Sequence, residues 1–144
     1  GLDFSRTAIK KNKKIFKSKF FYKDICSNKF SLKGKFDYIY CRFFLHTITS
    51  VDEKKFFKNL KKIIKKKTII FLEFRTNLDP YLKKGKRISE NESIYGHYRR
   101  FIDEKQLKDK IKLYNFKIKH ISSSFNYANY RMERPHICRI IFSY

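Results

Sequence analysis

Apolar residues recur along the chain at two spacings, which predict an alternation of helices and strands. The first predicted helix runs through Ala8, Ile9 and Ile15, with lysines on its polar face. Asp3 or Ser5 is positioned to cap it, because either side chain can accept a backbone hydrogen bond. Two short apolar runs follow and are predicted as strands; they span Phe20 to Ile25 and Phe36 to Leu45, with Phe36 to Tyr40 buried.

A second amphipathic helix, about four turns long, is predicted to begin at Ser50. Ser50 and Glu53 have the spacing of a capping box, in which two side chains satisfy free backbone donors. The near-continuous apolar run from Thr68 to Phe74 is typical of a parallel strand covered on both faces. The apolar positions of the helix are Phe56, Phe57, Leu60, Ile63 and Ile64.

The rest of the chain contains one long polar stretch and three further elements. Asn77 to Tyr98 is predicted as a loop, of the long kind that often serves as a functional lid. Asp103 is predicted to cap a helix that continues to Leu113. No helix separates the last two apolar segments, so they are predicted as an antiparallel pair of strands, Phe116 to Phe125 and His136 to Phe142.

This order of elements predicts a single α/β domain over residues 1–144. Helices between strands require crossover connections, so the sheet should be mostly parallel, with the final hairpin as an antiparallel edge. A length of 144 residues suits one domain, and a hydrophobic content of 42% excludes a disordered chain.

The charge balance points to an anionic partner, but only weakly. There are 36 Lys and Arg residues against 13 Asp and Glu, which gives a formal charge of +23. Such a charge suits nucleic acid, an anionic membrane surface or a phosphorylated substrate. However, the chain also favours the other residues that A/T-rich codons encode, and its lysines fall on the solvent faces of predicted helices.

The three cysteines indicate neither disulfides nor a metal site. Cys26, Cys41 and Cys138 are widely spaced, their number is odd, and no Cys-x-x-Cys pair is present. Reduced cysteines are typical of cytoplasmic proteins. No apolar run approaches the roughly 18 residues of a membrane helix, and no secretory signal opens the chain. We therefore expect a cytoplasmic protein with no metal and no membrane partner.

Two N-terminal segments resemble class I S-adenosylmethionine-dependent methyltransferases, whose Rossmann-like sheet binds the cofactor. Gly1 to Ser5 resembles the end of that family's second strand, and the resemblance implies that Asp3 accepts hydrogen bonds from the cofactor ribose. Phe21 to Ile25 resembles the third strand and its acidic turn. There the family's aspartate contacts the adenine amino group and the next residue packs on the ring, roles that fall to Asp24 and Ile25.

Phe36 to His46 resembles the fourth strand and the turn after it, and it carries the most specific pattern in the chain. This segment lines the cofactor's methionine end in the family, which implies contacts from Cys41 and Arg42. His46 becomes the candidate general base where the acceptor must lose a proton, although a lone histidine is also compatible with a packed position. Asp37 is interpreted as the structural start of the strand.

The acceptor side is predicted from basic residues in the second half of the chain. Arg75 follows the segment that resembles the family's fifth strand, and the carboxyl ends of such strands bind ligands. Arg75, like Arg42, either faces this ligand cleft or forms a surface salt bridge. His97, Arg99 and Arg100 lie in a segment that resembles a late element of several small-molecule methyltransferases. They are placed to clamp an anionic acceptor, or alternatively form a solvated face beside Asp103.

The family's glycine-rich loop, which follows its first strand, has no counterpart here. Neither Gly34 nor Gly85 lies between a strand and a helix in such a motif. The resemblance therefore implies an N-terminally truncated, partial methyltransferase domain that lacks the first strand and helix and binds the cofactor weakly.

The expected function is methyl transfer from S-adenosylmethionine to a small-molecule or sugar-type acceptor. The alternatives are a basic nucleic-acid-binding module or an RNA methyltransferase. The lysines are spread along the chain, and the Asn-Pro-Pro-Tyr-type signature of many base methylases is missing. Nucleic acid is therefore the less favoured partner.

Overall fold

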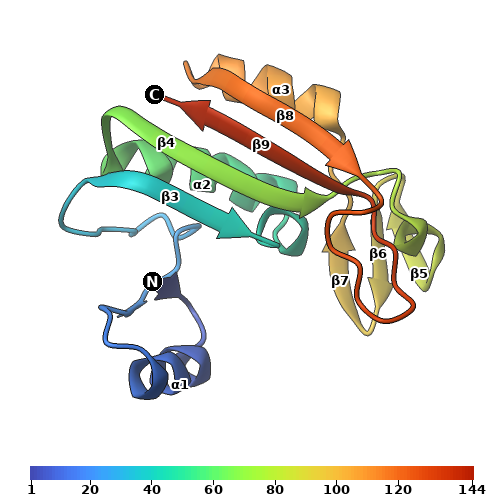
Figure 1. The fold of residues 1–144 in the computed structure, drawn as a ribbon, viewed down its shortest axis with the longest axis horizontal. Coiled ribbons are helices and arrows are strands. Elements are labelled where there is room, and N and C mark those ends of the chain that lie inside the picture. Colours follow the sequence, from blue (N-terminus) through green and yellow to red (C-terminus); the bar gives the residue numbers. More distant parts are fainter.

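A four-stranded sheet forms the centre of the computed structural model, which describes all 144 residues (Figure 1). Its strand order is β3–β4–β9–β8, and only the β3–β4 pair is parallel. Strands β3, β4 and β8 run in one direction and β9 runs in the other, so the predicted antiparallel β8–β9 pair is confirmed. The sheet is mixed in its pairing because β9 lies inside it, between β4 and β8, and not at its edge. The strands are β3 (Phe36–Arg42), β4 (Ile64–Arg75), β8 (Lys117–Ser124) and β9 (Ile137–Ser143).

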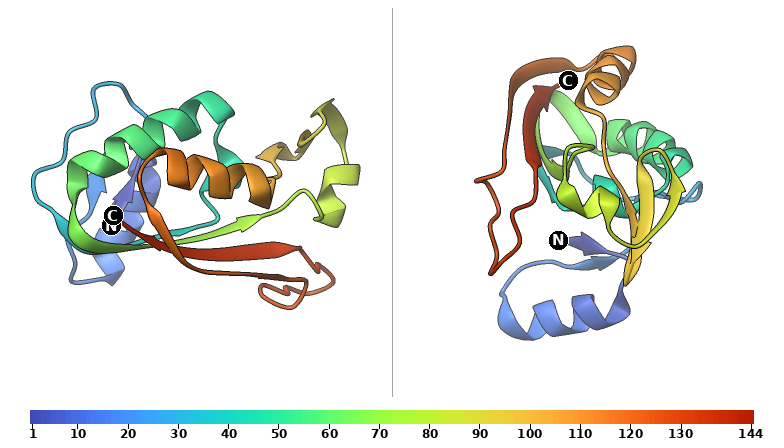
Figure 2. Two further views of the ribbon diagram at one scale, coloured as in Figure 1. Left: turned by 90° about the horizontal axis from the view of Figure 1, so that it is seen from above. Right: turned by 90° about the vertical axis from the view of Figure 1, so that its right-hand side faces the viewer.

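Helices α2 (Ser50–Ile63) and α3 (Glu104–Leu113) cover one face of this sheet (Figure 2). The apolar stripe predicted for α2 is confirmed, because Phe56, Phe57 and Leu60 are fully buried. The Phe57 ring stacks on that of Tyr114, with 5.1 Å between their centroids. The main hydrophobic core therefore lies between this helical layer and the sheet.

The helix caps follow the predicted chemistry with one shift. Ser5 caps α1 (Arg6–Ile15) and Asp103 caps α3. The cap of α2 is Thr49, not Ser50: its hydroxyl accepts from the Asp52 backbone N–H at 3.1 Å and donates to the Asp52 carboxylate at 2.9 Å. The cap lies one residue earlier than predicted, and Glu53 has no part in it but is buried in the core.

The N-terminal residues form a separate unit beneath the β3 edge (Figure 1). Strands β1 (Leu2–Asp3) and β2 (Phe21–Tyr22) make a two-stranded parallel sheet against which α1 packs. The predicted strand from Phe20 to Ile25 is much shorter in the structure, because the chain turns at Asp24. β1 and β3 each keep one edge that pairs with no strand.

The long stretch predicted as a loop is instead a third sheet. After the 3-10 helix η2 (Pro80–Lys83), strands β5 (Lys86–Ser89), β6 (Glu92–Tyr95) and β7 (His97–Arg100) form an antiparallel β5–β7 sheet. Gly85 precedes it with a φ of 76°, where a side chain would overlap the Ile94 carbonyl. The strands were not predicted because few of their residues are apolar, so alternation is hard to recognise.

The sheet face opposite α2 and α3 is open. Tyr38 and Tyr40 of β3 are 69% and 65% exposed, so the prediction of a buried strand is wrong for these side chains.

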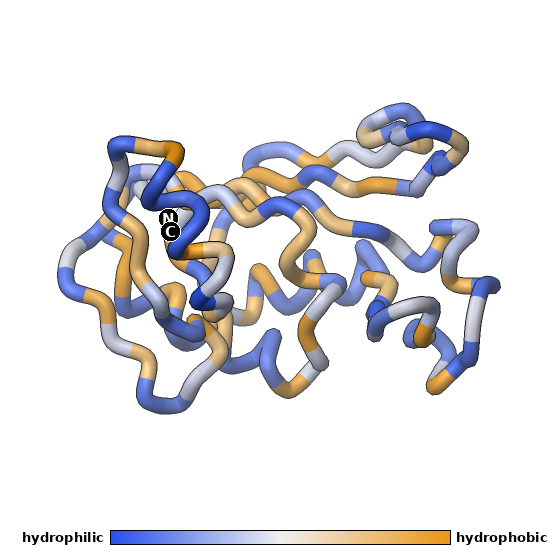
Figure 3. The backbone as a smooth tube through the Cα atoms, turned by 90° about the horizontal axis from the view of Figure 1, so that it is seen from below, coloured by the Kyte–Doolittle hydropathy of each residue, from blue (hydrophilic) through white to orange (hydrophobic).

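Hydrophilic residues recur at short intervals along the backbone, with no long uninterrupted apolar segment (Figure 3). None of the helices has the length and apolar character required to span a bilayer.

Candidate cofactor pocket and acceptor side

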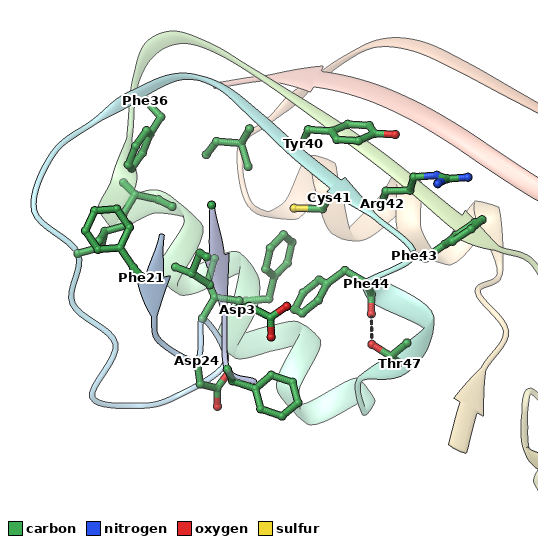
Figure 4. Close-up of a pocket in the computed structure, with 18 of the residues that line it drawn as sticks. Asp3, Phe21, Asp24, Phe36, Tyr40, Cys41, Arg42, Phe43, Phe44 and Thr47 are labelled. Atoms are coloured by element: carbon green, nitrogen blue, oxygen red, sulfur yellow. Dashed lines mark hydrogen bonds between the residues drawn. The ribbon is translucent and has the colours of Figure 1, made fainter. Parts of the chain in front are cut away.

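A pocket of about 560 Å³ lies between the unpaired edges of β1 and β3 (Figure 4). Most of its lining side chains are apolar, and they come from the N-terminal unit, β3 and α2. The volume and the lining are typical of sites for small ligands and cofactors. The sequence-predicted residues Asp3, Asp24, Ile25, Cys41 and Arg42 all line it.

Two carboxylates supply most of the polarity on the N-terminal side of the pocket. One oxygen of Asp3 accepts from the Ser5 backbone N–H at 2.7 Å, and one oxygen of Asp24 accepts from that of Cys26 at 2.7 Å. The second oxygen of each carboxylate has no protein partner. Both residues thus shape a turn and still present an acceptor to a hydroxyl or amine donor.

The other three predicted cofactor residues differ in what they offer. Ile25 is buried and provides apolar surface. Burial raises the pKa of the Cys41 thiol to about 12, so this side chain is a neutral, mostly apolar part of the wall. The Arg42 guanidinium points away from Asp3 and Asp24 (Figure 4), and its Nε donates to Glu73 at 2.8 Å. The expected cofactor contact by the Arg42 charge is therefore not supported.

His46 lies just beyond the pocket, in the 3-10 helix η1 (Leu45–Thr47). Its ring packs edge-on against that of Phe43, a lining residue, at 5.5 Å. The Nδ1 atom accepts from the Arg75 backbone N–H at 3.3 Å, which places the proton of the neutral ring on Nε2. Burial, with nearby Arg75, lowers the pKa of His46 to about 3. This arrangement suits a hydrogen-bond donor and disfavours the predicted general base.

Arg75 connects three segments and does not present its charge to a ligand. Its two terminal nitrogens donate to Asp79 before η2 and to Glu133 in the β8–β9 loop, each at 3.0 Å. The guanidinium also lies 4.9 Å from the centre of the Tyr81 ring. The predicted role in acceptor binding is therefore replaced by a structural one.

Arg100 is likewise committed to the fold. It is buried, donates to the Leu45 and Ile48 carbonyls, and forms an ion pair with Glu53. Lys110 of α3 also donates to Glu53, at 2.6 Å. The cluster of Glu53, Arg100 and Lys110 was not predicted from the sequence, because Glu53 had been assigned to the capping box of α2.

His97 and Arg99 are the predicted acceptor residues whose charges remain available. Two residues apart in β7, they lie on one face of the strand, opposite to Arg100. Arg99 donates to the Tyr95 carbonyl at 2.7 Å and has no carboxylate partner. Partial desolvation, with Arg99 and Arg75, lowers the pKa of His97. The structure thus brings His46, Arg75, His97 and Arg99 together near the carboxyl end of β4. The guanidinium of Arg100 lies beside them but is paired with Glu53, and that of Arg42 is paired with Glu73.

Asp3, Asp24 and Arg42 line the pocket at or just after the carboxyl ends of β1, β2 and β3, and such strand ends bind the ligand in α/β proteins with nucleotide-like cofactors. A methyltransferase-domain family model matches residues 1–121, and the chain belongs to this family. This places it among the S-adenosylmethionine-dependent methyltransferases.

Solved structures of such enzymes share the fold at low sequence identity. A methyltransferase from Methanosarcina mazei is 16% identical with a TM-score of 0.78, and the match covers 99% of this chain and 80% of that one. One from Clostridium acetobutylicum is 15% identical with a TM-score of 0.72, covering 99% and 73%. A glycopeptide N-methyltransferase in complex with S-adenosylmethionine is 8% identical with a TM-score of 0.68, covering 98% and 70%. No curated protein matches the chain.

Proposed function

We propose that the pocket between β1 and β3 binds S-adenosylmethionine through the N-terminal unit. Asp3 accepts from the ribose hydroxyls, Asp24 accepts from the adenine amine, and Ile25 packs on the adenine ring. The observation that carries this proposal is the pair of carboxylates, each with one unpartnered oxygen, at the edge of an apolar pocket. When bound, the cofactor supplies an electrophilic methyl group; Cys41 would form part of the wall at its methionine end.

We further propose that the acceptor is a small molecule, either anionic or a sugar, bound between η1 and the β5–β7 sheet. The Phe43–His46 contact joins this region to the pocket, and β7 packs against η1. His46 would donate from Nε2 to an acceptor oxygen, while His97 and Arg99 hold its other end. Catalysis would then rest on positioning the acceptor and excluding water.

The cofactor assignment is tested by an NMR titration of the full chain with S-adenosylhomocysteine. Resonances of Asp3, Asp24, Ile25 and Cys41 should shift, with a dissociation constant weaker than about 100 µM. Weak binding is expected because the pocket is open along two unpaired strand edges and Gly1 is the only glycine among its lining residues. A dissociation constant of about 1 µM would contradict that expectation.

Charge-neutralising variants make the titration specific. Asp3→Asn and Asp24→Asn should each weaken binding about tenfold, because each removes a charged hydrogen-bond acceptor. Asp37→Asn is the matched control: this carboxylate is exposed, pairs with Lys65 and does not line the pocket. Shifts confined to other parts of the chain, or equal losses in all three variants, would overturn the proposal.

The open sheet face supports nucleic-acid binding as a second candidate. Tyr38 and Tyr40 are exposed there, and the guanidinium groups of Arg42 and Arg139 lie on the same face. Exposed aromatic rings beside positive charge can stack bases of a single strand. Filter binding of an oligonucleotide should then fall steeply with salt, and Tyr38→Ala with Tyr40→Ala should weaken it further. No binding at low salt would remove this candidate.

A further inference from the structure

One face of the β5–β7 sheet carries a row of polar residues that crosses all three strands. Arg87, Ser93 and Arg99 lie directly opposite one another in the strand register. Directly opposite residues in antiparallel strands share a face, and His97 joins them because it lies two residues from Arg99. Glu92 pairs with Arg100 and so belongs to the opposite face. The row itself therefore contains no carboxylate.

Ser93 is the exceptional member of this row. It is 1% exposed, and its hydroxyl is the single buried side-chain polar atom in the structure that has no hydrogen-bond partner. Buried hydroxyls are almost always paired, because an unpaired one has lost its hydrogen bonds to water. An unpaired donor next to an arginine indicates that an acceptor group belongs between them.

The arginines near this face differ in how far their charge is compensated. Arg75 and Arg100 each pair with a carboxylate, and Arg87 donates to two carbonyls of its own turn. Arg99 donates only to the Tyr95 carbonyl, and its guanidinium lies 5.6 Å from the centre of the Tyr81 ring. Partial desolvation and the nearby Arg75 lower the pKa of Arg99, and the Glu133 carboxylate, which forms its salt bridge with Arg75, offsets this only in part. A partly buried guanidinium with unused donors favours an anionic partner.

We propose that Arg99, Ser93 and His97 form a subsite for an oxyanion group, a phosphate or a carboxylate, carried by the methyl acceptor. Arg99 supplies two parallel N–H donors, Ser93 donates its hydroxyl, and His97 donates from its ring. The statement that the oxyanion belongs to the acceptor rests on the proposed function; the oxyanion site itself does not. The charges of Arg99 and His97 lie close enough to His46 to contribute to its lowered pKa, so the subsite would anchor the acceptor near His46 and the cofactor pocket.

The test is an NMR titration of the full chain with inorganic phosphate in one arm and acetate in the other. Phosphate, acetate or both should shift the resonances of Arg99, Ser93 and His97, and the anion that binds more tightly identifies the group. The bound anion should also raise the pKa of His97, because a negative charge favours the imidazolium form. Binding of neither anion at these residues overturns the proposal.

Three variants separate this subsite from the general attraction of a chain with a charge of +23. Arg99→Gln should weaken anion binding at least tenfold. Arg6→Gln, which removes the same charge from α1, should change it less than twofold. Ser93→Ala should weaken binding about threefold while leaving the melting temperature unchanged or higher, because the hydroxyl has no partner to lose. Equal losses in Arg99→Gln and Arg6→Gln, or full binding by Ser93→Ala, would overturn the proposal.

A parallel titration with S-adenosylhomocysteine distinguishes the two proposals. Arg99→Gln and Ser93→Ala should bind the cofactor product as tightly as the unmodified chain, because neither residue lines the pocket. Anion binding without cofactor binding would support the subsite and reject the proposed function. Cofactor binding without anion binding would support the proposed cofactor site and reject the oxyanion subsite.

Discussion

Replacing Glu53 by alanine should lower the free energy of unfolding by about 3 to 5 kcal/mol. The Glu53 side chain is 1% exposed and pairs with both Arg100 and Lys110. Without the carboxylate, the buried Arg100 guanidinium keeps its positive charge with no counter-charge. The pair also connects β7 to α2, so its loss should loosen the β5–β7 sheet. Urea unfolding followed by circular dichroism measures the change.

Two further variants show whether the buried charge causes the loss. Glu90→Ala, at an exposed turn between β5 and β6, should change the free energy of unfolding by less than about 0.5 kcal/mol. The double variant Glu53→Leu with Arg100→Met should recover much of the loss, because apolar residues of similar size can replace a buried ion pair. A loss below about 1 kcal/mol for Glu53→Ala would contradict this assignment.

Arg75→Met should lower the free energy of unfolding by about 2 to 4 kcal/mol. Arg75 is the only cation that forms a salt bridge with Asp79, whose side chain is fully buried, and it also binds Glu133 of the β8–β9 loop. Removing it leaves the Asp79 carboxylate without a counter-charge and releases η2 and the loop from the end of β4. Thermal unfolding of the variant, beside Arg87→Met as a control, measures the loss. The control removes a guanidinium that is bound only to carbonyls of its own turn.

The loss in Arg75→Met should also depend on pH. In the unmodified protein burial raises the pKa of Asp79, so the folded state binds this proton more tightly than the unfolded state. The contribution of Asp79 to stability is therefore greatest below its ordinary pKa and falls as the pH rises through the folded value. Without Arg75 that pKa should rise further, so the fall should extend to higher pH. Parallel profiles for the variant and the unmodified chain between about pH 4 and pH 7 would contradict this.

Several elements could be predicted because their signals are local. The apolar side of α2, the long strand β4 and the closing β8–β9 pair follow from the spacing of apolar residues. The resemblance in the N-terminal segments likewise pointed to Asp3 and Asp24, and the structure brings both to one pocket. An aspartate at the end of a strand can be recognised in the sequence, because its carboxylate also accepts a hydrogen bond from the backbone of the turn that follows.

The sequence by itself therefore determined the order of helices and strands outside the β5–β7 sheet, the α/β class and the acidic edge of the pocket. Only the tertiary structure decided which basic residues remain available. Arg99 and Arg100 are neighbours in sequence, yet β7 turns one toward Ser93 and the other toward Glu53. Arg75 is neutralised by Asp79 and by Glu133, which is 58 residues away in the chain. Charges are compensated by contacts between distant segments, and such contacts leave no periodic or local mark in the sequence.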